Sequence, residues 1–263
     1  MHFGAIIIGD EILSGKRQDK HMSKVIEALS KRGLQLMWAR YQGDDPELIV
    51  ETLRHAYTSG DVIFSFGGIG ATPDDHTRQC AGRAGGVGLK LHPDADAEIR
   101  ARFKDDPKGI TPQRLEMGTF PIGSEIIPNP YNRIPGFHYK NIYFLPGFPQ
   151  MAWPMMEWVL DSYYKHLFDA NRIGEAAIIV REAGESLLIE LMKDVQARYP
   201  ALKVFSLPRV SPERFIELGA RGAPAEVAAA MVLLKDGVTA MQFPWTDAPK
   251  FGNAQEALSI KQP

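Results

Sequence analysis

Apolar and amphipathic segments alternate through the first 66 residues, and a glycine follows each apolar segment at once or one residue later. The apolar segments are residues 5–8, 34–41 and 61–66, and we predict that they form buried strands. Residues 19–32 and 45–60 carry apolar side chains at helical spacing and are predicted helices. A β-α-β-α-β order with short connections predicts a parallel sheet with helices on both faces. The expected fold class is therefore α/β, with three α/β/α layers and a mostly parallel sheet.

The chain changes character near residue 169. We predict that residues 1–169 form the α/β domain. This domain also contains predicted helices at 93–103, 111–117 and 149–166 and predicted strands at 126–127 and 141–145. Residues 175–240 have the order β-α-β-β-α and are expected to form a small C-terminal α+β module. Residues 244–263 are polar and are expected to be a frayed tail.

Charge and cysteine content narrow the classes of function. The chain has 30 Lys and Arg residues against 32 Asp and Glu residues, which gives a formal charge of −2. A protein that coats nucleic acid needs a clear basic excess, so we expect no nucleic-acid partner. No apolar run reaches the ~20 residues of a membrane span, so we expect no membrane association. Cys80 alone can form neither an internal disulfide nor a cysteine zinc site, and these features together favour the cytoplasm.

Acidic and hydroxyl side chains follow the first two predicted strands. In a doubly wound sheet, ligands bind beyond the carboxyl ends of the strands. Asp10, Glu11 and Ser14 follow the first strand, where the acids could hold a metal ion and Ser14 could meet a phosphate. After the second strand, Asp45 is expected to cap the next helix, which leaves Asp44 as the candidate for function. The alternative for both loops is a purely structural cap or turn.

The strongest sign of a ligand site is the segment after the third predicted strand, Gly67-Gly68-Ile69-Gly70-Ala71-Thr72-Pro73-Asp74-Asp75-His76-Thr77. The three glycines, Gly67, Gly68 and Gly70, allow backbone N–H groups to approach an anion closely. Thr72 and Thr77 add hydroxyl groups. A helix expected to start near residue 74 would present its N-terminus to the same ligand. A tight turn with Asp74 as a helix cap is the structural alternative.

The acids of this segment suit a phosphate site only if a divalent cation lies between carboxylate and phosphate. Mg²⁺ usually binds through one or two carboxylates together with substrate oxygens. We therefore expect a divalent cation, most simply Mg²⁺, held by Asp75 with Asp10, Glu11 or Asp44 assisting.

Two further features bear on ligands and partners. Arg133 lies in a loop rich in Pro and Gly, where a guanidinium is a reasonable phosphate contact. The predicted helix 149–166 is rich in Met and Trp, a composition that suits a core or an interface between subunits. We expect a homo-oligomer on this ground, and a scaffold that docks another protein is the alternative.

The loops resemble those of a known family. Residues 67–77 resemble the Gly-Gly-x-Gly-Pro-Thr-x-Asp-Asp-x-Thr loop of the molybdopterin-binding (MoaB/Mog-like) family, with Ala71 in place of the usual Pro. Residues 8–15 resemble the opening signature of its CinA-type (competence/damage-inducible protein A) members, and residues 184–186 the start of their small second module. A Tyr and an Arg at residues 131–134 replace a small Gly/Ala stretch and would reshape one wall of the pocket.

This resemblance implies a three-layer α/β core that binds a phosphorylated pterin or a nucleotide. Known activities of the family are adenylyl transfer to molybdopterin and metal-dependent cleavage of pyrophosphates such as ADP-ribose. Carried over by position, Asp44 and Asp75 match acids tied to activity, and residues 67–72 match the phosphate cradle. A deamidase domain of the CinA type would need more residues, and we expect none in this chain.

Two hypotheses of function follow from the sequence. The first is an enzyme that binds a nucleotide or pterin phosphate and cleaves a pyrophosphate such as ADP-ribose with the help of a cation. Adenylyl transfer to molybdopterin would use the same site. The second is a binding protein of the same fold that holds or delivers a pterin-type ligand without turnover.

Overall fold

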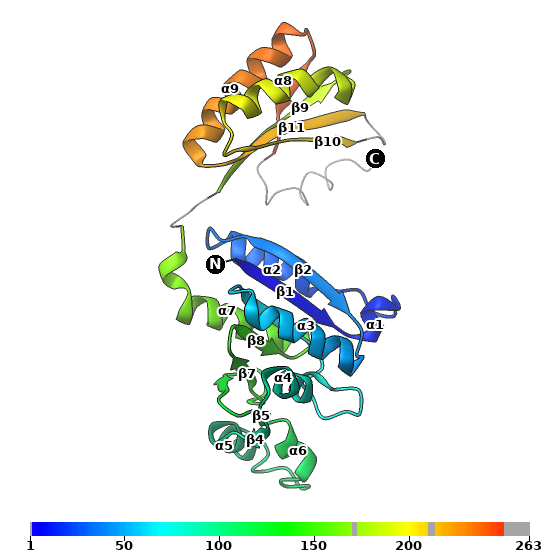
Figure 1. Cartoon of the computed structure of the whole chain (residues 1–263), viewed down its shortest axis with the longest axis vertical. Coiled ribbons are helices and arrows are strands. Elements are labelled where there is room, and N and C mark those ends of the chain that lie inside the picture. The colour runs from blue at the N-terminus through cyan, green and yellow to red at the C-terminus, as the bar shows by residue number, and fades with distance from the viewer. Residues whose placement is uncertain (1, 170–172, 210–213, 250–263) are drawn as a thin grey trace. The chain divides into compact units, whose positions relative to one another are not determined.

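The computed structural model describes residues 2–169, 173–209 and 214–249. The chain divides into two compact units, Met1–Phe168 and Asp169–Pro263. Each unit has helices and strands of its own (Figure 1). The buried apolar residues of the first unit form two clusters, and those of the second unit form a third. The two units are therefore described separately.

The first unit is built around a six-stranded sheet with the order β2-β1-β3-β8-β7-β6. Its strands are β1 (Phe3–Ile8), β2 (Leu36–Gln42), β3 (Val62–Phe66), β6 (Glu125–Ile127), β7 (Gly136–Tyr139) and β8 (Ile142–Leu145). The pairs β1–β2, β1–β3 and β3–β8 are parallel, whereas β7 is antiparallel to both β8 and β6. The prediction of a mostly parallel sheet is confirmed.

Helices cover both faces of this sheet. Helices α2 (His21–Ser30) and α7 (Pro149–Tyr163) pack on one face, and α3 (Pro46–Thr58) and α4 (Thr77–Gly85) pack on the other. Successive side chains of β1 alternate between the two cores, since Ile7 packs beneath α2 and α7 while Ile6 packs beneath α3. Burial on both faces is why the strand sequences are continuously apolar, and it confirms the three-layer α/β/α fold.

The remaining elements of the first unit are short. They are α1 (Asp10–Leu13), β4 (Leu89–Leu91), α5 (Pro93–Arg102), α6 (Pro112–Glu116), β5 (Thr119–Pro121) and the 3₁₀ helix η1 (Lys165–Leu167). Asp45 caps α3 as predicted, because its carboxylate accepts hydrogen bonds from the N–H groups of Glu47 and Leu48 at 2.9 and 3.0 Å. The helix expected near residue 74 begins at Thr77 instead, and residues 72–76 form the turn before it.

The second unit has the order β-α-β-β-α-β. Its elements are β9 (Gly174–Arg181), α8 (Glu185–Arg198), β10 (Lys203–Arg209), β11 (Phe215–Gly222), α9 (Pro224–Ala240) and β12 (Trp245–Asp247). The strands form an antiparallel sheet with the order β10-β11-β9-β12, against which α8 and α9 pack. Strand β12 corrects the prediction of a tail from residue 244, because it pairs with β9 through residues 245–247. Residues 250–263 lie outside the described part of the chain.

Helix α7 contributes to the core through its methionines. Met155 and Met156 are fully buried against the sheet, while Trp158 keeps 37% of its surface exposed. Cys80 is a buried free thiol, and burial raises its pKa to about 11. Within residues 2–169, 173–209 and 214–249, no helix is long and apolar enough to cross a membrane.

Two leucines of α3 offer a matched test of the core. Leu53 is fully buried and Leu48 is 49% exposed on the same helix. Leu53→Ala is expected to lower the free energy of unfolding by about 2–5 kcal/mol, because a cavity opens in the core. Leu48→Ala should change it by less than about 0.5 kcal/mol. Urea unfolding followed by tryptophan fluorescence measures both, and equal losses would contradict this packing.

Candidate functional site

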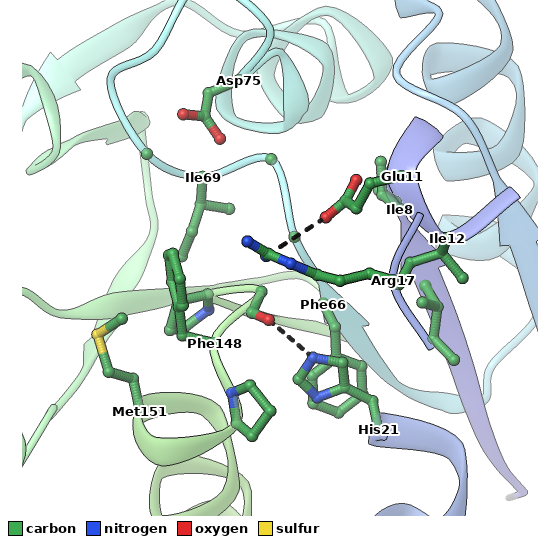
Figure 2. A pocket seen from close by; sticks show the side chains of 18 of the residues that line it. Ile8, Glu11, Ile12, Arg17, His21, Phe66, Ile69, Asp75, Phe148 and Met151 are labelled. Carbon is green, nitrogen blue, oxygen red and sulfur yellow. Dashed lines mark hydrogen bonds and ion pairs between the residues drawn. The ribbon is translucent and has the colours of Figure 1, made fainter. Parts of the chain in front are cut away.

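A cavity of about 1130 Å³ opens where the carboxyl ends of the parallel strands meet. The loops that follow β1, β2, β3 and β8 all line it, as does the segment before β7. Figure 2 labels residues from the loops after β1, β3 and β8, among them Glu11, Ile69 and Phe148. Parallel strands end at the same edge of a sheet, so loops distant in sequence come together there. Among the predicted site residues, this cavity gathers Glu11, Asp44, Gly67, Gly68, Gly70, Thr72 and Asp75.

The glycine loop after β3 has a backbone that requires glycine at two positions. Gly67 and Gly68 have φ angles of +100° and +69°. A Cβ atom at Gly67 would lie 2.3 Å from the carbonyl oxygen of Ile8, and one at Gly68 would lie 2.2 Å from Oγ1 of Thr77. The N–H groups of residues 68–71 donate to no acceptor in the described parts of the chain. Four consecutive unused donors beside a cavity are suited to an anion.

Thr77 holds this loop from behind rather than facing the cavity. Its hydroxyl donates to the carbonyl oxygen of Gly67 at 3.1 Å, and its N–H donates to that of Gly68 at 2.9 Å. The side chain is completely buried and does not line the cavity. Thr77 therefore does not contact the ligand as expected, because its hydroxyl already donates to the carbonyl oxygen of Gly67.

Arg78, which the sequence analysis did not single out, is the second support of the loop. Its guanidinium is buried and donates from Nε and Nη2 to the carbonyl oxygen of Gly70 at 3.2 and 2.7 Å. It also donates to the carbonyl oxygens of Glu116 and Thr119 and to a carboxylate oxygen of Glu116. Desolvation lowers the pKa of Arg78, and Glu116 opposes that shift. Its position beside the expected helix start was the available signal.

Asp10 and Asp44 join the loops after β1 and β2 by reciprocal hydrogen bonds. The N–H of Asp10 donates to Oδ2 of Asp44 at 2.9 Å, and the N–H of Asp44 donates to Oδ1 of Asp10 at 3.2 Å. Asp44 lines the cavity but Asp10 does not. Burial is the main cause that raises the pKa of Asp44, and the nearby charges of Asp10, Glu11 and Asp74 add to it. Asp10 is thus a positioning group for Asp44.

A basic segment before α2 supplies cations that the sequence analysis missed. Lys16, Arg17 and Lys20 all line the cavity. Arg17 lies 3.9 Å from the Glu11 carboxylate and over the ring of Phe148 at 5.9 Å (Figure 2). These residues lie in a polar loop between α1 and α2, so no apolar periodicity marks them. Their position after the first strand was the only available signal.

Asp75 faces the cavity with one carboxylate oxygen unused. Its Oδ2 atom accepts hydrogen bonds from the N–H of Thr72, at 2.9 Å, and from the Thr72 hydroxyl. Its Oδ1 atom has no donor within the described residues. In that same part of the chain, no group of three or more His, Cys, Asp or Glu side chains could hold a metal ion. A cation here would therefore need oxygens of the ligand, and the free oxygen of Asp75 fits that arrangement.

Two predicted ligand contacts lie away from the cavity. Ser14 ends α1 as an exposed residue, and Arg133 forms an ion pair with Glu98 at 2.8 Å. Tyr131 is 65% exposed, so the wall expected from residues 131–134 is formed by Asn132 and Ile134 instead. Arg133 is exposed and has a backbone φ of 64°. The side chain of Asn129 donates to the carbonyl oxygen of Ile134 and accepts from the N–H of Tyr131 in the same loop.

The other wall of the cavity is apolar and aromatic. Ile69, Phe148 and Met151 face it in Figure 2. His21 is 5% exposed beside them, stacks on Phe66 at 4.5 Å between ring centres, and hydrogen-bonds through Nε2 with the carbonyl oxygen of Gly147 at 3.1 Å. Burial lowers the pKa of His21, which favours the neutral ring. The cavity thus has a charged side and an apolar side.

The family described as "Probable molybdopterin binding domain" matches residues 4–166. A crystal structure of the protein CinA, with unknown function, from Thermoplasma acidophilum is similar, with a TM-score of 0.55 and 28% identity. That match covers 61% of this chain and 96% of the other.

Two curated relatives extend the comparison. A protein of Pyrobaculum arsenaticum is 28% identical over 208 residues, which is 78% of each chain. A CinA-like protein of Syntrophotalea carbinolica is 32% identical over 161 residues, which is 60% of this chain and 39% of that protein. The match therefore spans well under half of the CinA-like protein's length.

The raised pKa of Asp44 predicts a pH-dependent effect of Asp44→Asn. A native pKa above the unfolded value of about 3.9 means that wild-type stability falls as the pH rises through the interval between the two values. Asn keeps an oxygen for the Asp10 N–H and carries no charge. The variant should therefore be more stable than wild type at pH 7, and the difference should vanish below the unfolded value.

Urea unfolding across this pH range measures that difference. Asp105→Asn, at an exposed position without a hydrogen-bonded side chain among the described residues, is the matched control and should follow wild type throughout. An Asp44→Asn variant that is less stable than wild type at pH 7 would contradict the assignment.

Proposed function

Since the chain belongs to the family of probable molybdopterin binding domains, we propose that its cavity binds a nucleotide or pterin phosphate and promotes cleavage of a pyrophosphate bond. The observation that carries the proposal is the convergence of unused N–H donors, cations and carboxylates in one cavity. Fold similarity alone does not identify a reaction, whereas the chemistry of these groups limits which reactions are possible.

The phosphate end of the ligand would occupy the side lined by the glycine loop and the basic segment. The free N–H groups of residues 68–71 can donate to phosphate oxygens. Lys16, Arg17 and Lys20 add three positive charges on the same cavity. Backbone donors supply direction and the side chains supply charge, a combination that suits a diphosphate better than a single small anion.

The flat ring of the ligand would occupy the apolar side. Phe148 is 53% exposed and offers one face of its ring, and Ile69 and Met151 lie beside it. Exposure of an apolar phenylalanine ring to water is unfavourable. A flat heterocycle that stacks on the ring would remove that surface from water. The Arg17 guanidinium lies over Phe148, from where it can contact either the ring of the ligand or its phosphate. A pterin and a purine are both flat heterocycles that can stack in this way, so the proposal covers ligands with either ring.

A divalent cation, most simply Mg²⁺, would be held by the free Oδ1 atom of Asp75 together with phosphate oxygens, while Glu11 or Asp44 could assist through water. When bound, it would polarise the phosphoryl oxygens and lower the pKa of a bound water. Thr72 keeps Asp75 in place through two hydrogen bonds to Oδ2. The N–H donors of the glycine loop would stabilise the charge that develops on the phosphoryl oxygens.

With ADP-ribose as the substrate, one water would be consumed and AMP and ribose 5-phosphate released. The oxygen of water forms a bond to one phosphorus, and the bond between that phosphorus and the bridging oxygen breaks. With ATP and a pterin phosphate, the same geometry would instead transfer AMP and release pyrophosphate. The products therefore separate hydrolysis from adenylyl transfer.

Binding without turnover is a second candidate function. It is favoured by the finding that no cluster of three or more potential metal ligands occurs in the described residues. A carrier needs only the N–H donors, the cations and the apolar wall. Thermal shift with and without Mg²⁺ separates the two, since a ligand at about 100 times its dissociation constant stabilises by about 2.7 kcal/mol. Saturable binding with no product would support the carrier.

Asp75→Asn tests the catalytic proposal directly. Asn retains an oxygen for the Thr72 donors but lacks the charge needed to hold a cation. Turnover of ADP-ribose with Mg²⁺ should fall by about 100-fold or more, because phosphoryl charge is then stabilised less. Ligand binding without Mg²⁺ should remain. Quantification of AMP by chromatography measures turnover, Asp105→Asn serves as the control, and an undiminished rate in Asp75→Asn would overturn the role of this residue.

A further inference from the structure

A second, smaller pocket of about 250 Å³ lies between strand β2 and helix α3. It is lined by Trp38, Arg40, Thr52, His55, Ala56, Ser59 and Asp61. None of these residues lines the large cavity. Trp38 and Arg40 belong to β2, the strand that leads to Asp44, whereas Asp61 directly precedes β3 at the opposite end of the sheet. The pocket is thus separate from the site proposed above.

Thr52 provides the most direct sign of a ligand. Its side chain is 4% exposed, yet its Oγ1 atom has no hydrogen-bond partner in the described residues. A buried hydroxyl without a partner costs about 1–3 kcal/mol, so native structures usually satisfy it. A threonine in a helix can bond the carbonyl oxygen four residues earlier, but Thr52 does not. Thr52 thus lines this pocket with a buried hydroxyl that has no partner of its own among the described residues.

Two further side chains that can donate hydrogen bonds, Arg40 and His55, line the pocket, and both are exposed. Arg40 projects from β2 and His55 from α3, three residues after Thr52. Neither side chain has a hydrogen-bond or ion-pair partner among residues 2–169, 173–209 and 214–249. The guanidinium, the imidazole and the hydroxyl come from two elements and line one small space. All three can donate to oxygen.

Asp61 does not cancel this donor set, because its carboxylate already has donors of its own. Trp38 donates from Nε1 to Oδ2 at 2.9 Å, and Nδ1 of His2 lies 3.3 Å from Oδ1. The hydrogen bond from Trp38 is the main cause that lowers the pKa of Asp61, with His2 contributing. The carboxylate therefore holds the indole in place and keeps its own negative charge, so Arg40 and Asp61 bring opposite charges to the pocket.

The Trp38 indole, which forms one wall of the pocket, packs against the backbone of Gly4 in β1. A Cβ atom at Gly4 would lie 2.3 Å from the Trp38 ring, so the absence of a side chain lets the indole lie across β1. Trp38 pairs with Gly4 in the register of β1 and β2. The ring thus occupies a fixed position beside the donors, where it can report on whatever binds there.

From these contacts we propose that the small pocket binds the phosphoryl group of a small phosphorylated ligand. Three separate donors match the three terminal oxygens of a phosphoryl group better than the two oxygens of a carboxylate. A volume of about 250 Å³ accommodates that group with a small part of its carrier. The pocket is a second anion site, on the same unit as the large cavity but independent of it.

The indole N–H resonances of Trp38 and Trp153 test this proposal in one NMR spectrum, because Trp153 lines the large cavity and Trp38 lines the small pocket. Inorganic phosphate should shift the Trp38 resonance saturably, with a dissociation constant of about 1 mM or weaker. Sulfate should act similarly, whereas acetate at equal ionic strength should not. Trp→Phe variants assign the two resonances.

Matched variants decide whether the donors cause the response. Arg40→Gln should raise the dissociation constant at Trp38 by about tenfold or more, and the isosteric Thr52→Val should weaken binding without changing the shift at Trp153. Arg54→Gln, an exposed arginine of α3 outside the pocket, should respond like wild type. The proposal is overturned if phosphate leaves Trp38 unmoved, if acetate acts equally, or if Arg40→Gln and Arg54→Gln respond alike.

Discussion

The carbonyl oxygens of the glycine loop are held by the first turn of α4, and the rest of the candidate site depends on those contacts. Thr77 binds the carbonyls of Gly67 and Gly68, and Arg78 binds that of Gly70. In a trans peptide, the C=O of one residue and the N–H of the next point in opposite directions. Carbonyls drawn toward α4 therefore leave the N–H groups of the residues that follow them facing away, toward the cavity. The direction of these unused N–H donors thus depends on Thr77 and Arg78, two buried side chains that do not line the cavity.

The parallel sheet explains why so many groups reach one place. Strands β2, β1, β3 and β8 run in the same direction, so the loops at their carboxyl ends converge, although the ends of β1 and β8 are 137 residues apart in the sequence. Asp10 and Asp44 then join two of those loops by two hydrogen bonds across 34 residues. A Cβ atom at Gly43 would lie 2.3 Å from Oδ1 of Asp10. A side chain at residue 43 would therefore displace the Asp10 carboxylate from its hydrogen bond with Asp44.

The sequence predicted the strands, the helices between them and the glycine loop, because each has a local pattern of apolar spacing or glycine. It could not assign the hydroxyls, since a threonine that binds a ligand and one that binds a backbone carbonyl look alike in sequence. Thr72 lines the cavity and Thr77 supports the loop from behind. The ion pair of Arg133 with Glu98, 35 residues away, and the return of β12 to β9 depend on tertiary contacts that no local pattern encodes.

The mixed charge of the large cavity determines what it can bind under our proposal. Glu11, Asp44 and Asp75 would repel a phosphate that arrives without a cation, and these carboxylates form no cluster that could hold a cation without help. Lys16 and Arg17 attract the phosphate but repel the cation. A phosphate that carries its cation satisfies both sets of charges at once. The cation and the phosphate should therefore each raise the affinity for the other, by the same factor, since such coupling is reciprocal. A cavity of this composition favours a diphosphate with its cation over either partner alone.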